Sequence, residues 1–213
     1  MDTSFITINT HSSIRIQTKQ GTTVYVDPYG FEDEPHDADL ILITHTHFDH
    51  FSPEDITRVR KPNTVFIFPA WNMMDFIKAG FTDEQAAFLV PYETATPLPQ
   101  IKVETVPAYN ISKRFHPEDN AWMGYIVEAD GVRVYVAGDT DDIPDNRSID
   151  CDIALVPVGG TYTMDAREAA AFVNALKPKV AIPEHYGTVA GSPEDGKTFA
   201  SLVDPSIEVV FKL

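Results

Sequence analysis

The chain contains one cysteine, Cys151, among 213 residues, so an internal disulfide framework is excluded. Basic residues are also scarce: 16 Lys and Arg stand against 32 Asp and Glu, which gives a formal net charge of −16. Nucleic-acid binding relies on Lys and Arg that neutralise phosphates, and no local basic patch offsets the acidic balance. We therefore expect no nucleic-acid partner.

Long apolar runs are absent as well. No segment approaches the ~20 apolar residues that cross a bilayer, and residues 1–5 carry neither the basic region nor the apolar stretch of a secretion signal. We therefore expect a cytoplasmic protein with no membrane partner. The length suffices for one sizeable core, and no linker or repeat interrupts it, so residues 1–213 are expected to form a single domain.

Residue types that bind metals are concentrated in one segment. An apolar strand expected over residues 37–44 is followed within six positions by three histidines and one aspartate: His45, His47, Asp49 and His50. Imidazole and carboxylate are ligands of borderline divalent metals such as Zn²⁺. Since side chains alternate along a strand, His45 and His47 point the same way and can share one metal. Asp49 and His50 lie beyond the strand and can reach a second, and two metals ~3.5–4 Å apart form a recognised hydrolytic device.

The pattern His-x-His-x-Asp-His resembles that of the metallo-β-lactamase superfamily. The resemblance implies an α/β fold, a four-layer αββα sandwich of two mixed β-sheets flanked by helices, with a mono- or dinuclear site at one edge. It also implies a third histidine for the first metal, a bridging aspartate, and a late histidine for the second metal.

Two of these residues have clear candidates. Asp139, in Gly138-Asp139-Thr140, directly follows a strand expected over residues 132–137, and this triplet is similar to a common superfamily form. His185 leaves a strand expected over residues 180–183. The alternatives are an ordinary turn aspartate and a capping or surface histidine.

The third histidine is less sharply defined. Many relatives carry a histidine at what corresponds to Asn110, where this chain departs from the pattern. A similar subgroup has Ala-Tyr-Asn followed by Phe-His-Pro, which favours His116 as the ligand and leaves Asn110 as a partner of a ligand or of the substrate. If His116 is not a ligand, the first site is weak and the enzyme holds one metal.

Two further residues match the family pattern near the site. His11 lies between the first two strands, and Asp27 follows the third. Asp27 could hydrogen-bond a metal-binding histidine and so fix its tautomer and orientation. The alternative for both is a polar residue satisfied at a turn. Residues 159–166 resemble a subgroup that includes ascorbate-phosphate lactonase-like proteins.

Alternation and capping residues predict the remaining elements. Strands are expected over residues 4–10, 14–19, 23–27, 64–68, 101–107, 123–129, 153–158 and 208–212, of which the first three form an antiparallel meander. Helices are expected after Ser52, over residues 70–79, from Asp165 to about Leu176, and after Ser192.

These residues predict a metal-dependent hydrolase. A metal lowers the pKa of bound water from about 15.7 toward 7, so the site makes hydroxide at neutral pH while Asp49 accepts its proton. We expect two Zn²⁺ per chain, with Mn²⁺ or Fe as alternatives, and a small ester, lactone or phosphodiester as substrate. Lys113 and Arg114 could hold an anionic group or be a solvated pair. The alternative is a metal-binding or sensing protein without turnover, and the sequence does not indicate an oligomeric state.

Overall fold

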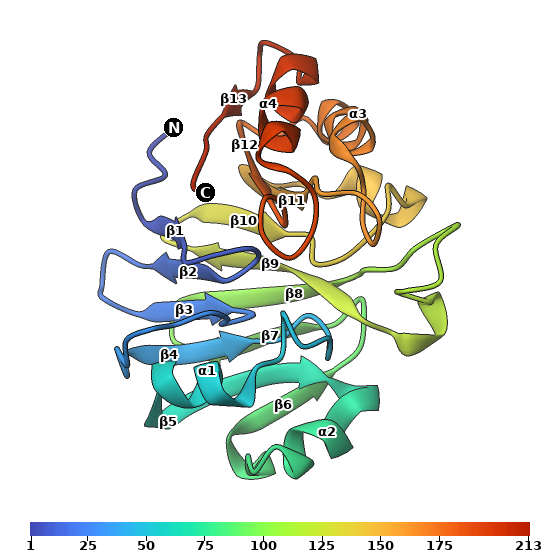
Figure 1. Ribbon diagram of the computed structural model, residues 1–213. Helices are drawn as coiled ribbons and strands as arrows, with labels where there is room; N and C mark the ends of the chain where they lie inside the picture. The colour runs from blue at the N-terminus through green and yellow to red at the C-terminus, as the bar shows by residue number, and fades with distance from the viewer.

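The first sheet contains six strands in their sequence order, as the computed structural model, which describes residues 1–213, shows (Figure 1). They are β1 (Ile6–Ile8), β2 (Ile14–Gln17), β3 (Thr23–Val26), β4 (Ala38–Leu42), β5 (Arg60–Pro69) and β6 (Ala86–Leu89). The first three strands are antiparallel, as their alternation predicts, and β3 to β6 run parallel. The sheet is therefore mixed.

The second sheet contains seven strands in the order β13-β12-β11-β10-β9-β8-β7. Their bounds are β7 (Thr94–Leu98), β8 (Ile101–Pro107), β9 (Met123–Ala129), β10 (Val132–Val136), β11 (Ile153–Pro157), β12 (Val180–Glu184) and β13 (Glu208–Val209). Strands β7 to β10 are antiparallel and β10 to β13 parallel, so this sheet is mixed too.

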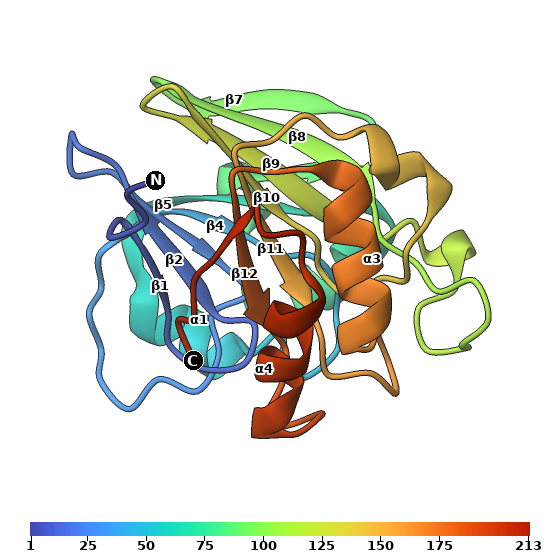
Figure 2. The same cartoon turned by 90° about the horizontal axis from the view of Figure 1, so that it is seen from above.

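Helices cover the outer face of each sheet (Figures 1 and 2). Side chains of α1 (Pro53–Val59) and α2 (Met73–Lys78) pack on the first sheet, and those of α3 (Ala166–Leu176) and α4 (Pro193–Leu202) on the second. The expected four-layer αββα sandwich is thus confirmed. The connections contain the 3₁₀ turns η1 (Ala70–Asn72), η2 (Asp83–Gln85), η3 (Glu118–Asn120) and η4 (Pro144–Ser148). No helix has the length and apolar character that crossing a bilayer requires.

Strand β4 shows why the layers hold together. Leu40 and Leu42 point into the core between the sheets, whereas Ile41 points into the core under α1 and α2. All three side chains are fully buried. Burying one such side chain contributes roughly 1.5–3 kcal/mol. The strand is therefore apolar on both faces, and the polar residues that follow it stand out.

Helix starts follow the expected capping chemistry. Asp165 accepts hydrogen bonds from the backbone of Arg167 and Glu168, and the Glu168 carboxylate accepts one from the backbone of Asp165. Ser52 caps α1 through the backbone N–H of Asp55 at 3.3 Å. Each cap satisfies N–H groups that a helix start leaves without partners.

The elements differ from the expectations in several details, among them that β6 was not expected as a strand. Strand β7 was not expected, because Pro97 and the polar residues of Thr94–Leu98 do not look like a strand; as an edge strand paired only with β8, it tolerates the proline. The helix expected over residues 70–79 divides into η1 and α2 at Asn72, whose side chain is bonded elsewhere. The last strand is limited to Glu208–Val209.

The strand directions place one set of loops at a common edge. The parallel strands β3 and β4 end on the same side of the first sheet, as β10, β11 and β12 do in the second. The two edges are joined by hydrogen bonds from the Met123 backbone to Thr44 O at 3.2 Å and from the His185 backbone to His11 O at 3.2 Å. Loops from both sheets therefore meet at one site.

Candidate metal centre

Two groups of side chains converge at this edge. In the first, ligand atoms of His45, His47, His116 and Asp139 all lie within 4.8 Å of one another. His45 Nε2 lies 3.1 Å from His47 Nδ1, and His116 Nε2 lies 3.2 Å from Asp139 Oδ2. Three imidazoles and a carboxylate form a donor set that suits Zn²⁺.

The second group contains His11, Asp49, His50 and His185, again with ligand atoms within 4.8 Å of one another. His11 Nε2 lies 3.1 Å from Asp49 Oδ2, and the Nε2 atoms of His50 and His185 lie 3.7 and 3.8 Å from the same oxygen. These residues come from three separate places in the chain, since Asp49 and His50 are adjacent.

Asp139 contacts members of both groups. Its Oδ2 lies 3.2 Å from Nε2 of His116 and 3.2 Å from Nε2 of His185, and its Oδ1 lies 3.2 Å from Nε2 of His50. Gly138 allows this approach: its φ is +64°, and a Cβ there would lie 3.2 Å from Cβ of Thr44. Asp139 therefore faces both groups of possible ligands.

Asp27 and Thr44 contact the Nδ1 atoms of His50 and His45, respectively. Asp27 Oδ2 accepts from His50 Nδ1 at 2.7 Å and from Thr44 Oγ1 at 2.5 Å, and Asp27 Oδ1 accepts from the Thr44 backbone at 2.8 Å. Thr44 Oγ1 also lies 2.9 Å from His45 Nδ1. A partner on Nδ1 fixes the ring and leaves Nε2 for a metal.

Asn110 performs the same task for His116. Its Oδ1 accepts from both the backbone and Nδ1 of His116 at 3.1 Å each. The Asn110 amide in turn donates to Asp141 Oδ1 at 3.1 Å and to Tyr162 O at 2.9 Å. Both polar atoms of the Asn110 side chain are therefore engaged in hydrogen bonds. This favours Asn110 as the residue that orients His116 rather than as a metal ligand.

Three residues of the centre adopt a left-handed backbone that ordinary residues avoid. The φ angles are +52° for His11, +48° for Asp27 and +57° for His185. Such conformations cost of order 1 kcal/mol or more each and tend to occur at functional sites. The surrounding fold holds these side chains in place at the expense of local stability.

Several buried atoms that could bind a metal make no well-aligned hydrogen bond, although each imidazole nitrogen among them lies 3.2 Å from an Asp139 oxygen. These are Nε2 of His50, His116 and His185, and Oδ1 of Asp139. Buried polar atoms are nearly always bonded, so four such atoms aimed at one place need a further partner. A metal ion accepts nitrogen and oxygen donors of this kind, and the residues present therefore fit a metal.

The pKa values of the buried histidines also favour a bound cation. Burial lowers the pKa of His45, His47 and His11. Burial also acts against protonation of His50 and His185, but the Asp139 carboxylate outweighs it and raises the pKa of both. The buried carboxylates thus attract positive charge, and a divalent cation supplies it while releasing protons from the imidazoles.

All ten residues singled out in the sequence lie at this centre. The six histidines, Asp49 and Asp139 belong to the two donor groups, and Asp27 and Asn110 hold histidines from outside. His11 was expected only as an outer contact, yet its Nε2 lies within the second group. The sequence reasoning missed Thr44 and Asp141, although both directly neighbour or closely follow predicted ligands.

Trp122 was also missed. Its ring lies 5.0 Å from that of His45, 4.9 Å from that of His47 and 5.5 Å from that of His116, measured between centroids. Its Nε1 donates to Asn72 Oδ1 at 2.9 Å. Trp122 therefore forms an apolar wall against the first donor group. No metal-ligand pattern in the sequence marks it.

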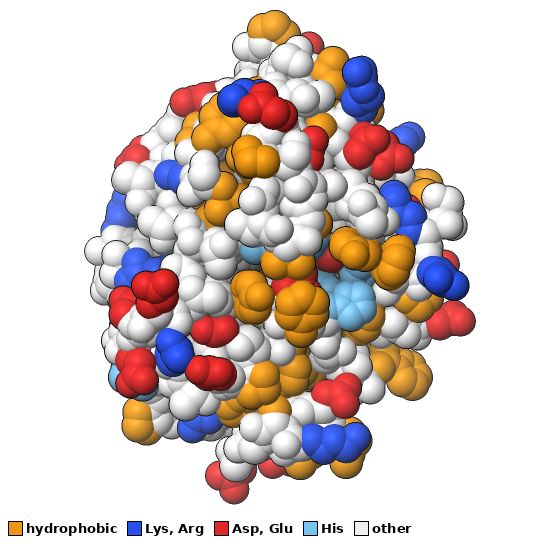
Figure 3. All heavy atoms as spheres, viewed as in Figure 1, with side chains coloured by type: hydrophobic (Ala, Val, Ile, Leu, Met, Phe, Trp, Pro, Cys, Tyr) orange, Lys and Arg blue, Asp and Glu red, His pale blue; other side chains and the backbone are white.

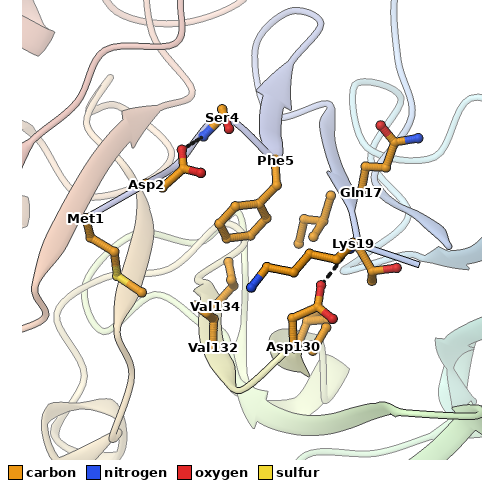
Figure 4. A pocket seen from close by; sticks show the side chains of 13 residues that line it. Met1, Asp2, Ser4, Phe5, Gln17, Lys19, Asp130, Val132 and Val134 are labelled. Atoms are coloured by element: carbon orange, nitrogen blue, oxygen red, sulfur yellow. Dashed lines mark hydrogen bonds between the residues drawn. The ribbon is translucent and has the colours of Figure 1, made fainter. Parts of the chain in front are cut away.

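The two largest cavities do not contain this chemistry. One of about 500 Å³ lies between the N-terminal segment and the β9–β10 hairpin, with Phe5, Lys19 and Val132 in its wall (Figure 4). It opens at the start of β10, whereas Asp139 follows the end of that strand. The other, of about 640 Å³, is lined by Thr10 and Tyr186 but by none of the donors. The candidate metal centre is therefore identified by its cluster of possible ligands and not by either of these cavities.

Comparison with known proteins agrees with this centre. Residues 5–185 match the family model described as the beta-lactamase superfamily domain. The chain belongs to the metallo-β-lactamase superfamily. A UPF0173 metal-dependent hydrolase of Thermococcus onnurineus is 31% identical over 202 residues, covering 88% of this chain and 87% of that protein.

Solved structures of the superfamily show the same architecture. A protein from Parabacteroides distasonis, described as a metal-dependent hydrolase, is 35% identical with a TM-score of 0.81 and covers 98% of this chain and 92% of its own. A metallo hydrolase from Ignicoccus hospitalis is 25% identical with a TM-score of 0.75, covering 97% and 93%. The enzyme class expected from the sequence is therefore the one that these relatives carry, while the resemblance to ascorbate-phosphate lactonase-like proteins stays a prediction.

Proposed function

We propose that this chain is a two-metal hydrolase that cleaves a small ester, lactone or phosphodiester. The observation that carries the proposal is the presence of two adjacent groups of four possible ligands. Asp139 belongs to the first group and also lies 3.2 Å from His185 of the second. The predominance of neutral imidazole donors favours Zn²⁺, with Mn²⁺ or Fe as alternatives. His45, His47 and His116 would hold the first metal, and Asp49, His50 and His185 the second, with Asp139 between them.

His11 is the fourth member of the second group. Its Nε2 is close enough to Asp49 to act as a donor to that carboxylate or as a further metal ligand. Its buried ring also lies 3.9 Å from the ring of His185, centroid to centroid, so it supports that ligand in either role.

The metals, when bound, lower the pKa of water and polarise the carbonyl or phosphoryl oxygen of the substrate. The Asp49 carboxylate acts as the general base. Burial alone would raise its pKa, but the His11 hydrogen bond and the charge of His50 lower it below its usual value. Asp49 is therefore ionised at neutral pH and accepts a proton from the attacking water, while the hydrogen bond from His11 fixes its orientation.

The test combines metal analysis with turnover. Protein purified without chelator should contain between one and two equivalents of Zn, Mn or Fe, and chelation should remove both metal and hydrolysis of p-nitrophenyl acetate, a lactone or bis(p-nitrophenyl) phosphate. Restoring Zn²⁺ should restore both. Two bound metals with no turnover on any of the three would favour a binding or sensing role, and protein that takes up no metal on titration would end the proposal.

A further inference from the structure

Large apolar side chains are exposed around the metal centre. Phe48 is 67% exposed, Trp71 74%, Ile111 64% and Phe115 40%. Figure 3 shows orange hydrophobic side chains on all sides of the pale-blue histidines and red carboxylates at the middle of this face. Large apolar side chains gathered around one centre favour an interaction site, whereas apolar residues exposed singly do not.

Phe48 and Phe115 lie on loops that carry proposed ligands. Phe48 stands between His47 and Asp49 in the sequence, and its ring lies 6.3 Å from that of Tyr29. Phe115 directly precedes His116 and packs edge-on against Tyr162 at 4.7 Å. The apolar side chains are therefore held at the mouth of the centre.

Ile111 and Trp71 are anchored in the same way. The Ile111 backbone donates to Asp141 Oδ2 at 2.9 Å, within the network that orients His116. Trp71 directly precedes Asn72, whose side chain bonds Trp122 and reaches Thr46 Oγ1 at 3.4 Å. We call Phe48, Trp71, Ile111 and Phe115 the apolar rim.

The apolar rim has few cationic side chains free to bind an anionic substrate. Lys113 is already engaged, since its Nζ lies 2.5 Å from Asp141 Oδ1 and 3.7 Å from Glu168 Oε2. Arg114 is the cation that remains on this loop, and it is exposed. The net charge of −16 further disfavours approach by anions.

We propose that the centre hydrolyses an uncharged carboxylic ester or lactone whose apolar chain lies against the rim residues Phe48, Ile111 and Phe115. This inference rests on the proposed hydrolase function and narrows it. Water oxygen adds to the acyl carbon, the bond from that carbon to the alkoxy oxygen breaks, and the proton from water goes to the departing oxygen. The products are a carboxylic acid and an alcohol, and no further reactant is needed.

The test compares substrates that differ in apolar length. With Zn²⁺-loaded protein, kcat/KM for p-nitrophenyl hexanoate should exceed that for the acetate by about 10-fold or more, because each buried methylene is worth roughly a factor of four. Phe48→Ala should lower the hexanoate-to-acetate ratio about fivefold, and Ile111→Ala should lower it in the same direction. Leu202→Ala, which truncates an exposed leucine on α4, should leave both rates unchanged.

Metal content and apparent mass are measured for every variant. If hexanoate is no better than acetate, or if bis(p-nitrophenyl) phosphate is the best substrate and Arg114→Ala abolishes its cleavage, the inference is wrong and the hydrolase function stands. If Phe48→Ala changes the mass on size exclusion but not the ratio, the rim is an interface between copies. If the metal-loaded protein cleaves none of these substrates, the function and the inference fail together.

Discussion

Replacing Asp139 by asparagine removes one negative charge while keeping nearly the same shape. Asp139 is buried, and its two oxygens lie 3.2 Å from Nε2 atoms of His50, His116 and His185. Two divalent cations bring four positive charges together, and the neutral imidazoles offset none of them. The carboxylate that faces both groups therefore contributes to both sites at once.

The size of the effect follows from this position. Loss of an outer partner of a metal ligand typically weakens metal binding 10- to 100-fold. Asp139 faces the metal positions directly, so we expect Asp139→Asn to weaken binding by at least about 100-fold, or about 2.7 kcal/mol, at the second site. Hydrolytic activity should fall at least as far.

The fold should persist in this variant. In the metal-free protein the Asp139 carboxylate raises the pKa of His50 and His185 against the effect of burial. When the carboxylate is gone, these imidazoles lose that support and release their protons. The variant is therefore not left with an unpaired buried charge from this group.

Elemental analysis, metal titration and circular dichroism measure the three outcomes. His36→Gln, in the exposed acidic loop, is the matched control and should change neither metal content nor turnover. If Asp139→Asn binds two metals with unchanged affinity and retains full turnover, Gly138-Asp139-Thr140 is only a turn, and the two-metal reasoning is refuted at its centre.

Three other substitutions test separate parts of the structure. His116→Ala should lose metal from the first site. Asn110→Ala removes the hydrogen bonds of the Asn110 amide to His116, Asp141 and Tyr162 and should weaken titrated Zn²⁺ binding about 10-fold; the reverse ranking would make Asn110 the ligand. Far from the centre, hydrogen bonds from Arg133 and Lys102 lower the pKa of Glu104 to about 2. Because this pKa lies below the unfolded value, the stabilisation is present above about pH 4.3 and is lost as pH falls toward 2. Glu104→Gln should lower the unfolding free energy at pH 7 by at most about 1 kcal/mol, since solvent still screens this partly buried ion pair, and urea titrations should converge with the parent near pH 2; an equal difference at both pH values would contradict this assignment.

Much of the site follows from where apolar strands stop. The strands that precede His45, Asp139 and His185 are visible in the sequence because they are mostly apolar, and a histidine or aspartate shortly after each of them is conspicuous. Parallel order then brings those ends to one edge. The antiparallel edge strand β7 was not visible, because an edge position relaxes the residue preferences that make a strand recognisable.

The pairings between loops of the first sheet could not be read from the strand patterns, and only the family pattern pointed to a histidine partner for Asp27. Asp27 bonds His50 across 23 positions, and His11 bonds Asp49 across 38 positions. No periodicity links residues so far apart. His11 also occupies a left-handed backbone conformation, which a turn histidine in the sequence does not disclose. Its membership of the second donor group therefore depends on how the β1–β2 loop folds over the edge.

The outer partners explain why the chain can depart from the usual ligand pattern at position 110. The Asn110 amide joins the loop that follows β8 to the loop that follows β10, through Asp141. It also fixes the ring of His116, which comes six positions later. A ligand supplied from a loop needs such a clamp, because a loop alone does not hold an imidazole to the tolerance that metal binding demands. In the proposed metal centre, His116 in the loop takes the place of a histidine at the strand end, and Asn110 at the strand end positions it.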